Sequence, residues 1–571
     1  MNDIRRTILW VIFAFSLVML WDQWQVHNGR QATFFPSAST VTAASGAASA
    51  PASAVPSAAS TPSAVPSAVP DSTLAAPVAS VPGAVDTAPT VPRERIEVST
   101  DVLRLVFDTE GGSIIKSAFP GYDEQGQPGE PLVLLDTSAN RVYQAQSGLI
   151  GGAFPTHKTV MAFSGERTLA DGANELVLRF ESPEVGGVRL VRTYTLQRGS
   201  YVIGVRNEVL NQSGQPVSPQ LYVQLVRDGN SPPGGSTFYS TFTGPAFYSD
   251  EKKFQKVDFS SIDKGRADFV TRAPDGWVAM VQHYFASAWI PPEGTQRENF
   301  ARKVDNNLYA AGAIVPLGSI APGETGAMDV RLFVGPQKEK MLESIAPGLE
   351  LVKDYGFFTI LSKPLYWLLD KLHGVLGNWG WSIVALVVLL KIAFYWLNAK
   401  AYQSMARMKA INPKIMELRE RYKDKPQQMQ QEMMRIYREE KVNPMGGCLP
   451  ILIQIPVFIA LYWVLLSSVE IRGAPWILWI QDLSVKDPYF ILPVIMTLTT
   501  LLQTALNPLP PDPMQAKLMW IMPLVFSVMF FLFPSGLVLY WVTNNILTIA
   551  QQWFINTRMG VPPQFNLPKF K

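Results

Sequence analysis

Cysteine, histidine and excess charge are all scarce in this chain, and each shortage excludes a class of function. The single cysteine, Cys448, excludes an internal disulfide and any metal site built on cysteines. A net charge of +3 is too small to indicate direct binding of nucleic acid. His157 and His283 lie far apart with no motif around them, so a structural role is the default for both. No Walker motif is present, and we expect no cofactor, no bound metal and no nucleotide requirement.

Apolar residues, in contrast, are abundant and concentrated in a few long blocks. They make up 47% of the chain. Blocks that approach the ~20 residues needed by a membrane-crossing helix are typical of integral membrane proteins. The stretch between the first two blocks lacks this character. The composition therefore predicts a membrane protein with one soluble domain.

The first apolar run comes directly after two positive residues. Arg5 and Arg6 precede residues 8–21, as in a signal sequence or a signal-anchor. The short run favours a cleaved signal, whereas its bulky tryptophans and the lack of a small-residue cleavage site favour an uncleaved transmembrane signal-anchor over residues 1–24. Either interpretation leaves the N-terminus in the cytoplasm and exports the chain beyond the run. Residues 25–92, rich in Ala, Pro and Ser, are predicted to be an exported linker that buries no core.

Residues 93–336 are predicted to form the exported soluble domain. Val188, Leu190, Tyr194 and Leu196 point to one face of an expected strand, because they alternate with other residues at a period of two. Similar runs succeed one another, separated by turns rich in Gly, Pro and Asn. This pattern favours a mostly antiparallel β-sandwich.

The segment 337–376 is predicted to be an amphipathic helix in the membrane interface. Its apolar residues recur at helical spacing, and Lys363, Asp370 and Lys371 interrupt them. The rival interpretation is a further membrane span. The first anchor exports the chain, so one crossing must return it to the cytoplasm, and residues 379–397 suit that crossing better. The number of membrane crossings that the topology allows therefore argues against a further span at residues 337–376.

A membrane core is predicted over residues 377–556. After residues 379–397 come four more apolar runs, at 448–469, 489–506, 518–533 and 536–555. With the anchor these give six spans and place both termini in the cytoplasm. The expected tail, 557–571, is short and only mildly basic.

The loop between the first two core spans has the character of a cytoplasmic hairpin. Eleven Lys and Arg residues outnumber six Asp and Glu residues between positions 400 and 441, as expected for a cytoplasmic loop. Apolar residues recur at steps of three and four on both sides of Lys425 and Pro426. They predict two antiparallel helices over residues 399–442, and we expect Pro413 to end or kink the first of them.

Lys391 is the most informative residue of the core. A cation deep in a membrane helix costs roughly 3 kcal/mol, so it either snorkels to the interface or faces a polar cavity. Amides such as Gln454 and Asn544 also need partners away from lipid, and hydrogen bonds between helices would satisfy them. Such bonds explain the lysine poorly, because no Asp or Glu lies deep in any predicted span. A hydrated groove open to the cytoplasm is favoured, where the cation attracts acidic segments of a passing chain.

Several core stretches resemble one family. They are GNWG at 377–380, KVNPMGGCLP at 441–450, QIPVF at 454–458, DPY at 487–489, DPMQ at 512–515 and FPSGLVLYW at 533–541. These residues resemble the YidC membrane-protein insertases of Gram-negative inner membranes, closely over residues 340–556. The resemblance implies an α-helical polytopic membrane protein with six transmembrane helices, five forming the core. It also implies a periplasmic antiparallel β-sandwich domain and a cytoplasmic helical hairpin.

The resemblance also implies function and site residues. The family inserts, folds and helps assemble inner-membrane proteins, alone or with the Sec translocon, through a hydrophilic groove bearing a positive charge; it catalyses no covalent reaction. The matching groove positions are Lys391, Gln454, Tyr540, Asn544, Asn545 and Thr548. Most relatives with a large exported domain carry Arg where this chain has Lys391. Lys keeps the charge as a point cation but lacks the bidentate geometry of Arg.

The partners implied by the resemblance are nascent membrane proteins, the Sec translocon and membrane lipids. The ribosome and signal-recognition targeting factors are expected at the hairpin 399–442 and at the second cytoplasmic loop, 507–517. An ion or small-molecule transporter is the first alternative function, although carboxylates in the spans or an internal repeat would then be expected. An enzyme acting on envelope polymers through the β domain is the second.

Overall fold

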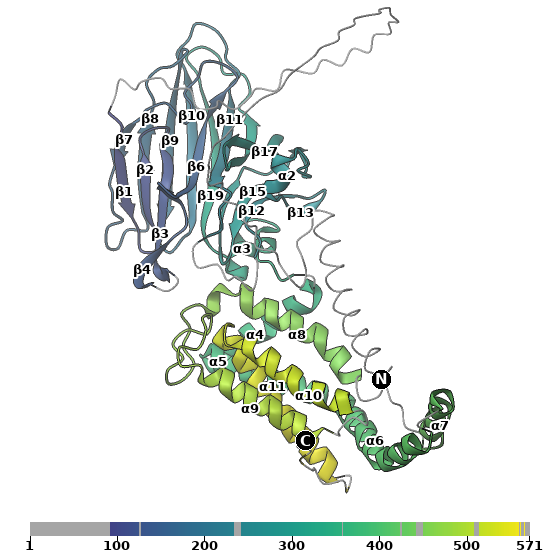
Figure 1. Ribbon diagram of the computed structural model, residues 1–571. Coiled ribbons are helices and arrows are strands. Elements are labelled where there is room, and N and C mark those ends of the chain that lie inside the picture. The colour runs from purple at the N-terminus through teal and green to yellow at the C-terminus, as the bar shows by residue number, and fades with distance from the viewer. Residues whose placement is uncertain are drawn as a thin grey trace, which may run out of the picture.

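The computed structural model describes residues 92–124, 127–232, 241–356, 358–422, 425–440, 449–507 and 513–558, together with Gly560 and Phe565. The predicted signal-anchor (1–24), almost all of the linker and most of the tail lie outside the described residues. So do residues 441–448 of the longest motif and residues 508–512 of the second expected loop. The described chain forms a β domain above a group of helices, as Figure 1 shows.

The β domain consists of two antiparallel sheets packed face to face. The first runs in the order β1-β2-β3-β6-β11-β18-β17-β14, with β4 paired to β3 and β5 paired to β6. Its strands are β1 Arg95–Ser99, β2 Arg104–Asp108, β3 Ser113–Glu124, β4 Gln127–Val133, β5 Asp136–Ser138, β6 Arg141–Ile150, β11 Gln220–Asp228, β14 Arg272–Ala273, β17 Arg297–Asp305 and β18 Leu308–Pro316. The predicted antiparallel sandwich is confirmed.

The second sheet runs in the order β13-β12-β15-β16-β19-β10-β9-β8-β7. Its strands are β7 Ala162–Gly165, β8 Glu175–Glu181, β9 Val188–Gln197, β10 Val202–Asn211, β12 Gly244–Ser249, β13 Lys253–Lys256, β15 Trp277–Gln282, β16 Phe285–Ile290 and β19 Thr325–Pro336. The alternation read along residues 188–196 falls on β9. Its members Val188, Leu190, Tyr194 and Leu196 are all buried in the core.

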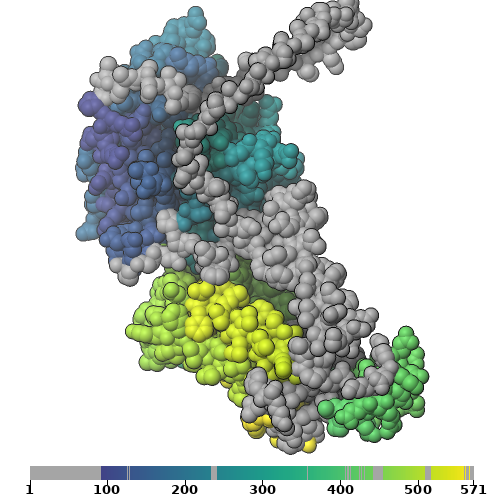
Figure 2. Space-filling view, in the orientation of Figure 1, coloured from purple at the N-terminus to yellow at the C-terminus, as the bar shows by residue number. Residues whose placement is uncertain are grey.

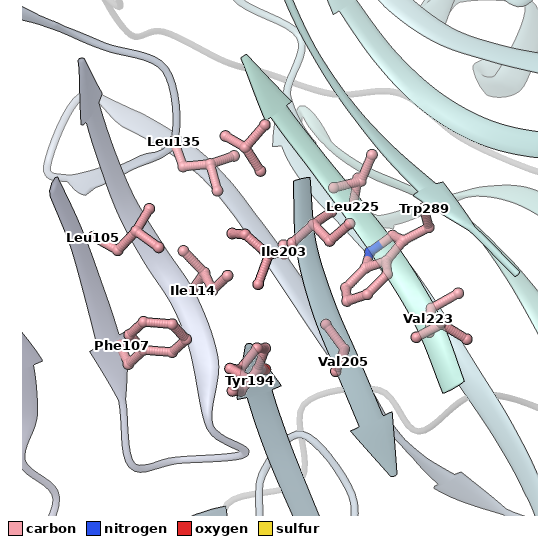
Figure 3. Packing of buried hydrophobic residues seen from close by; sticks show 14 of the residues in the cluster. Leu105, Phe107, Ile114, Leu135, Tyr194, Ile203, Val205, Val223, Leu225 and Trp289 are labelled. Atoms are coloured by element: carbon pink, nitrogen blue, oxygen red, sulfur yellow. The ribbon is translucent and has the colours of Figure 1, made fainter. Parts of the chain in front are cut away.

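The core lies between the sheets, where side chains of both interdigitate (Figure 3). Phe107 of the first sheet meets Tyr194 of the second edge to face, with ring centroids 4.9 Å apart. Trp289 donates its indole N–H across the sandwich to the carbonyl of Gln224, at 3.0 Å. Each fully buried aromatic or aliphatic side chain of this kind stabilises the fold by roughly 2 kcal/mol.

The helices have bounds that agree with the predicted segments in outline. They are α2 Phe259–Asp263, α3 Glu339–Ile345, α4 Thr359–Leu376, α5 Trp379–Ala393, α6 Tyr395–Arg421, α7 Pro426–Glu439, α8 Leu449–Ser467, α9 Ile491–Leu506, α10 Pro513–Phe530 and α11 Ser535–Arg558, with 3-10 turns η1 Leu349–Val352 and η2 Val469–Ile471. The α6–α7 pair projects away from the other helices at the end opposite to the sandwich, as Figure 2 also shows.

Three local expectations need correction. The amphipathic segment is α3, η1 and α4 in succession, because Pro347 and Gly348 (φ 72°) interrupt the helical backbone. The run 379–397 is divided at Phe394 between α5 and α6. Helix α6 begins at Tyr395, earlier than the expected start of the hairpin, and continues through Pro413 to Arg421, so that proline does not end it; a kink at Pro413 stays a prediction.

The hydrophobic length of the helices bears on how they could span a membrane. In the part of the chain that the structure describes, no single helix is long and apolar enough to cross a bilayer on its own. Helix α5 and residues Tyr395–Ser404, bent by 63° at their junction, reach that length and composition together. Shorter apolar helices are Gln454–Ser467, Ile491–Leu506 and Ala516–Phe530.

Candidate functional site

Lys391 lies in the last turn of α5, with its side chain turned into the helical group. Only 8% of the residue is exposed. Its ammonium donates a hydrogen bond to the Thr548 hydroxyl on α11, at 2.7 Å. Thr548 in turn donates to the Asn544 carbonyl one turn earlier, at 2.6 Å. The cation is therefore held by a neutral oxygen from a second helix.

The break after α5 is stabilised by the same helix α11. The last carbonyls of a helix have no partner within it. Gln551 supplies one, because its amide donates to the Lys391 carbonyl at 3.2 Å. The Gln551 carbonyl oxygen accepts a hydrogen bond from Asn398 on α6, at 3.3 Å. The bend that turns the chain from α5 into α6 is thus satisfied by polar groups next to the lysine.

A cavity opens beside Lys391, and the empty space in it, including a part that is open to solvent, amounts to about 450 Å³. Helices α5, α6, α8 and α11 form its walls. Its lining combines five apolar side chains with one cation and four uncharged polar side chains. The lining residues are Val387, Leu390, Lys391, Phe394, Leu397, Asn398, Gln454, Val457, Tyr540 and Asn544. Such a lining can meet both the apolar and the polar groups of a bound molecule.

Two amides join the walls of the cavity. Gln454 of α8 donates to the Asn544 side-chain oxygen of α11, at 2.8 Å. Four of the six predicted site residues, Lys391, Gln454, Tyr540 and Asn544, therefore line one cavity, and Thr548 holds the lysine.

The sixth predicted residue, Asn545, faces elsewhere. Its amide donates to Thr500 and Thr499 of α9, at 2.9 and 3.2 Å. Asn545 is 3% exposed and is absent from the lining of the cavity as described. Its contacts join α11 to α9. Asn398 was missed in the sequence analysis; it lies beyond the break at Phe394, so its place beside Lys391 depends on the bend between α5 and α6.

The described residues give Lys391 no ion-pair partner. They also contain no group of three or more His, Cys, Asp and Glu residues able to hold a metal ion. A buried cation without a counter-ion is a costly arrangement inside a membrane protein. The site therefore offers a buried positive charge beside a partly polar cavity.

Two family models and several relatives match the chain. The model described as the YidC periplasmic domain matches residues 95–368, and the model described as the 60Kd inner membrane protein matches residues 371–561. A membrane protein insertase YidC of Cupriavidus metallidurans is 56% identical over 98% of this chain and 98% of its own length. Another, of Burkholderia multivorans, is 52% identical over 98% of this chain and 99% of its own length. The chain belongs to the YidC family of membrane protein insertases.

Membership in the YidC family settles the broad function. The chain is an inner-membrane insertase with a periplasmic β-sandwich domain and a helical membrane domain, and its substrates are membrane proteins. The family is not enzymatic, so the transporter and enzyme alternatives are set aside. A solved structure, an active YidC insertase with the first transmembrane domain resolved, aligns over 80% of this chain and 91% of its own at 20% identity, with a TM-score of 0.38.

Proposed function

We propose that the cavity beside Lys391 is the groove in which this insertase receives the translocated segment of a substrate. The observation that carries the proposal is the burial of Lys391 beside a cavity, with a threonine hydroxyl as its hydrogen-bond partner. Lys391, Gln454, Tyr540 and Asn544 contact the segment in this proposal. Thr548 orients the cation, and Asn545 supports the wall from the side of α9.

The proposed sequence of events begins with an acidic or polar segment that enters from the cytoplasmic side. It replaces the water around Lys391 and interacts with the cation and the amides. The apolar helix of the substrate then passes into lipid along α8 and α10. Burial of apolar surface supplies the free energy, at about 25 cal/mol per Å². Hydrolysis of a nucleotide is unnecessary in this scheme.

The finer topology and partners are part of the same proposal. We infer six transmembrane spans, five of them in the core, with both termini in the cytoplasm and the hairpin α6–α7 facing the cytoplasm. The basic excess over residues 400–441 supports this orientation. We infer that the ribosome and signal-recognition targeting factors bind this hairpin and the loop 507–517, and that some substrates arrive with the Sec translocon.

The test is insertion of a single-span substrate with an acidic exported tail into liposomes that contain the purified insertase. Wild type is compared with Lys391→Arg, Lys391→Ala and Lys391→Glu. We expect Arg to retain insertion and Ala and Glu to lose it, because only Arg keeps the cation. A substrate with a neutral exported tail serves as the matched control and should depend less on the charge.

Equal insertion by all four proteins would overturn the proposed role of Lys391. A requirement for ATP hydrolysis by the purified protein would overturn the proposed source of free energy.

A further inference from the structure

The short turn η2, which follows the outer end of α8, packs into the β domain. Val469, which comes after α8 in η2, is 1% exposed and belongs to the hydrophobic core of the sandwich. Two residues later, Ile471 belongs to the core of the helical group. Nearby positions of one short turn therefore pack into two different cores, which ties the end of α8 to both of them.

Glu470, between these two residues, is held by a buried cation. Lys353 comes just after η1, its side chain is fully buried, and its ammonium lies 3.2 Å from Glu470 Oε2. Tyr366 of α4 donates its hydroxyl to the other oxygen of Glu470, at 2.7 Å. The Lys353 ammonium also lies 3.8 Å from the centre of the Tyr366 ring. Both charges thus have specific partners, as a buried pair requires.

The β domain also caps α8 directly. His283, in the turn between β15 and β16, donates through Nε2 to the carbonyl of Leu466, at 2.9 Å. This carbonyl is one of the last of α8 and lacks a partner within the helix. Arg472, just after η2, donates to the carbonyl of Asp123 in β3.

The segment before α4 closes the junction from the other side. Gly356 has φ 66°, and a Cβ at this position would lie 2.7 Å from the indole of Trp463 on α8. Ser362 of α4 donates to the carbonyl of Ala460 on α8, at 3.2 Å. The outer half of α8 is therefore enclosed by α4, by its preceding turn and by the β domain.

Helix α8 carries this junction at one end and the cavity at the other. Gln454, its residue in the cavity, lies thirteen positions before Ser467, which is about 20 Å along the helix axis. The opposite wall is formed by α11, and in the described residues no hydrogen bond or ion pair joins α11 to the β domain. One wall of the cavity is thus joined to the β domain by a hydrogen bond and by packing of the following turn, whereas the other wall has neither a hydrogen bond nor an ion pair to it among the described residues.

We propose that the junction between the periplasmic β domain and the helices holds the outer end of α8 in place, and that Lys353, acting through Glu470, is a positioning residue for the cavity wall that bears Gln454. The link from this wall to insertion rests on the proposed groove function. The geometric part does not, because the position of α8 relative to α11 can be measured without a substrate.

The experiment uses the full chain with Cys448→Ser, Gln454→Cys and Asn544→Cys, and measures the rate at which a short thiol-to-thiol reagent cross-links α8 to α11. Two junction variants are compared in this background. Lys353→Met with Glu470→Gln removes both charges and leaves no unpaired buried ion. Tyr366→Phe removes only one hydroxyl, so it still tests the junction if the paired variant fails to fold. Insertion is measured in the same junction variants with Gln454 and Asn544 intact.

Two further variants serve as controls. Lys353→Arg keeps the cation. Arg189→Met breaks an exposed pair with Glu181 that lies on β8 and β9, away from the junction. We expect Arg189→Met to show wild-type cross-linking and insertion, and Lys353→Arg to show values near those of wild type.

In the paired variant we expect cross-linking and insertion to fall about fivefold, the lower range of coupling between distant sites. Tyr366→Phe should give about a threefold fall in both, as for loss of one hydrogen bond. Wild-type cross-linking in both junction variants would overturn the proposal. Slower cross-linking with unchanged insertion would support the geometric part and overturn the link from this wall to insertion. The groove proposal is tested separately, by the insertion measured for the Lys391 variants, in which the junction is intact.

Discussion

Lys391 and Thr548, 157 positions apart in the sequence, meet side chain to side chain across α5 and α11 at 2.7 Å. The hydroxyl accepts from the ammonium and donates to the Asn544 carbonyl, so its own orientation is fixed. A threonine on α11 thereby determines where the charge of α5 points. This pair gives the most direct test of the site.

Thr548→Val keeps the shape of the side chain and removes the acceptor. We expect insertion of an acidic-tailed substrate to fall about fivefold, since a hydrogen bond of this kind contributes ~1 kcal/mol. Thr548→Ser is the matched control and should insert like wild type. Wild-type insertion by Thr548→Val would show that the hydroxyl does not orient the lysine.

The two neighbouring asparagines of α11 should respond differently. Asn545→Ala breaks the bonds to Thr499 and Thr500, and we expect it to lower the free energy of unfolding by about 1 kcal/mol. Insertion should change little. Asn544→Ala breaks the bond to Gln454 and should mainly lower insertion. Unfolding in detergent and insertion in liposomes, measured on both variants, check the contrast; a reversed pattern contradicts the placement of these residues.

His157 should make the β domain less stable in mild acid. Burial, assisted by Lys158, Arg302 and Arg192, lowers the pKa of His157 to about 4. The unfolded chain titrates near 6.5, so it binds the proton more readily than the folded chain between these values. Stability is fully present above pH 6.5 and is lost as the pH falls toward 4, by about 2 kcal/mol at pH 5.

The measurement is unfolding of the wild-type protein and of His157→Gln at pH 7.5 and pH 5.0. Gln does not titrate, so the variant should lose less stability over this interval. Equal losses in the two proteins would contradict the assignment of the acid sensitivity to His157.

Trp289 should be among the most costly core residues to truncate. It is 1% exposed, and its indole joins the two sheets through Gln224. Trp289→Ala should lower the free energy of unfolding by about 4 kcal/mol, and Trp289→Phe by less. Urea titrations of the full chain check this; a loss below ~1 kcal/mol from the alanine variant would mean that the core collapses around the gap.

The sandwich was predictable because its strands keep a period of two over long runs, as in residues 188–196. The residues of the site were predicted from the family resemblance, and helix geometry accounts for two of them, since Asn544 and Thr548 lie four apart and so share a helix face. Their neighbour Asn545 was grouped with them by the same resemblance. Adjacent positions on a helix differ by about 100° in direction, and that rotation turns Asn545 toward α9.

The break at Phe394 left no local signal. No Gly or Pro occurs between Gly380 and Pro413, and the partner that satisfies the broken end is Gln551 on another helix. Val469 misled the sequence reasoning in a similar way. Its position at the end of an apolar run indicated a membrane residue, whereas tertiary packing places it inside the β-sandwich. Both cases depend on contacts between segments remote in the sequence.

The position of Val469 also limits how the molecule can be divided or recombined. An excised fragment 93–336 would keep every strand yet lack one buried member of its own core. In a hybrid that joins this periplasmic domain to the helices of a relative, the relative's residue at position 469 would replace Val469 in the core of the sandwich. When the two parts are exchanged between relatives, the short turn around position 469 therefore has to be transferred together with the sandwich.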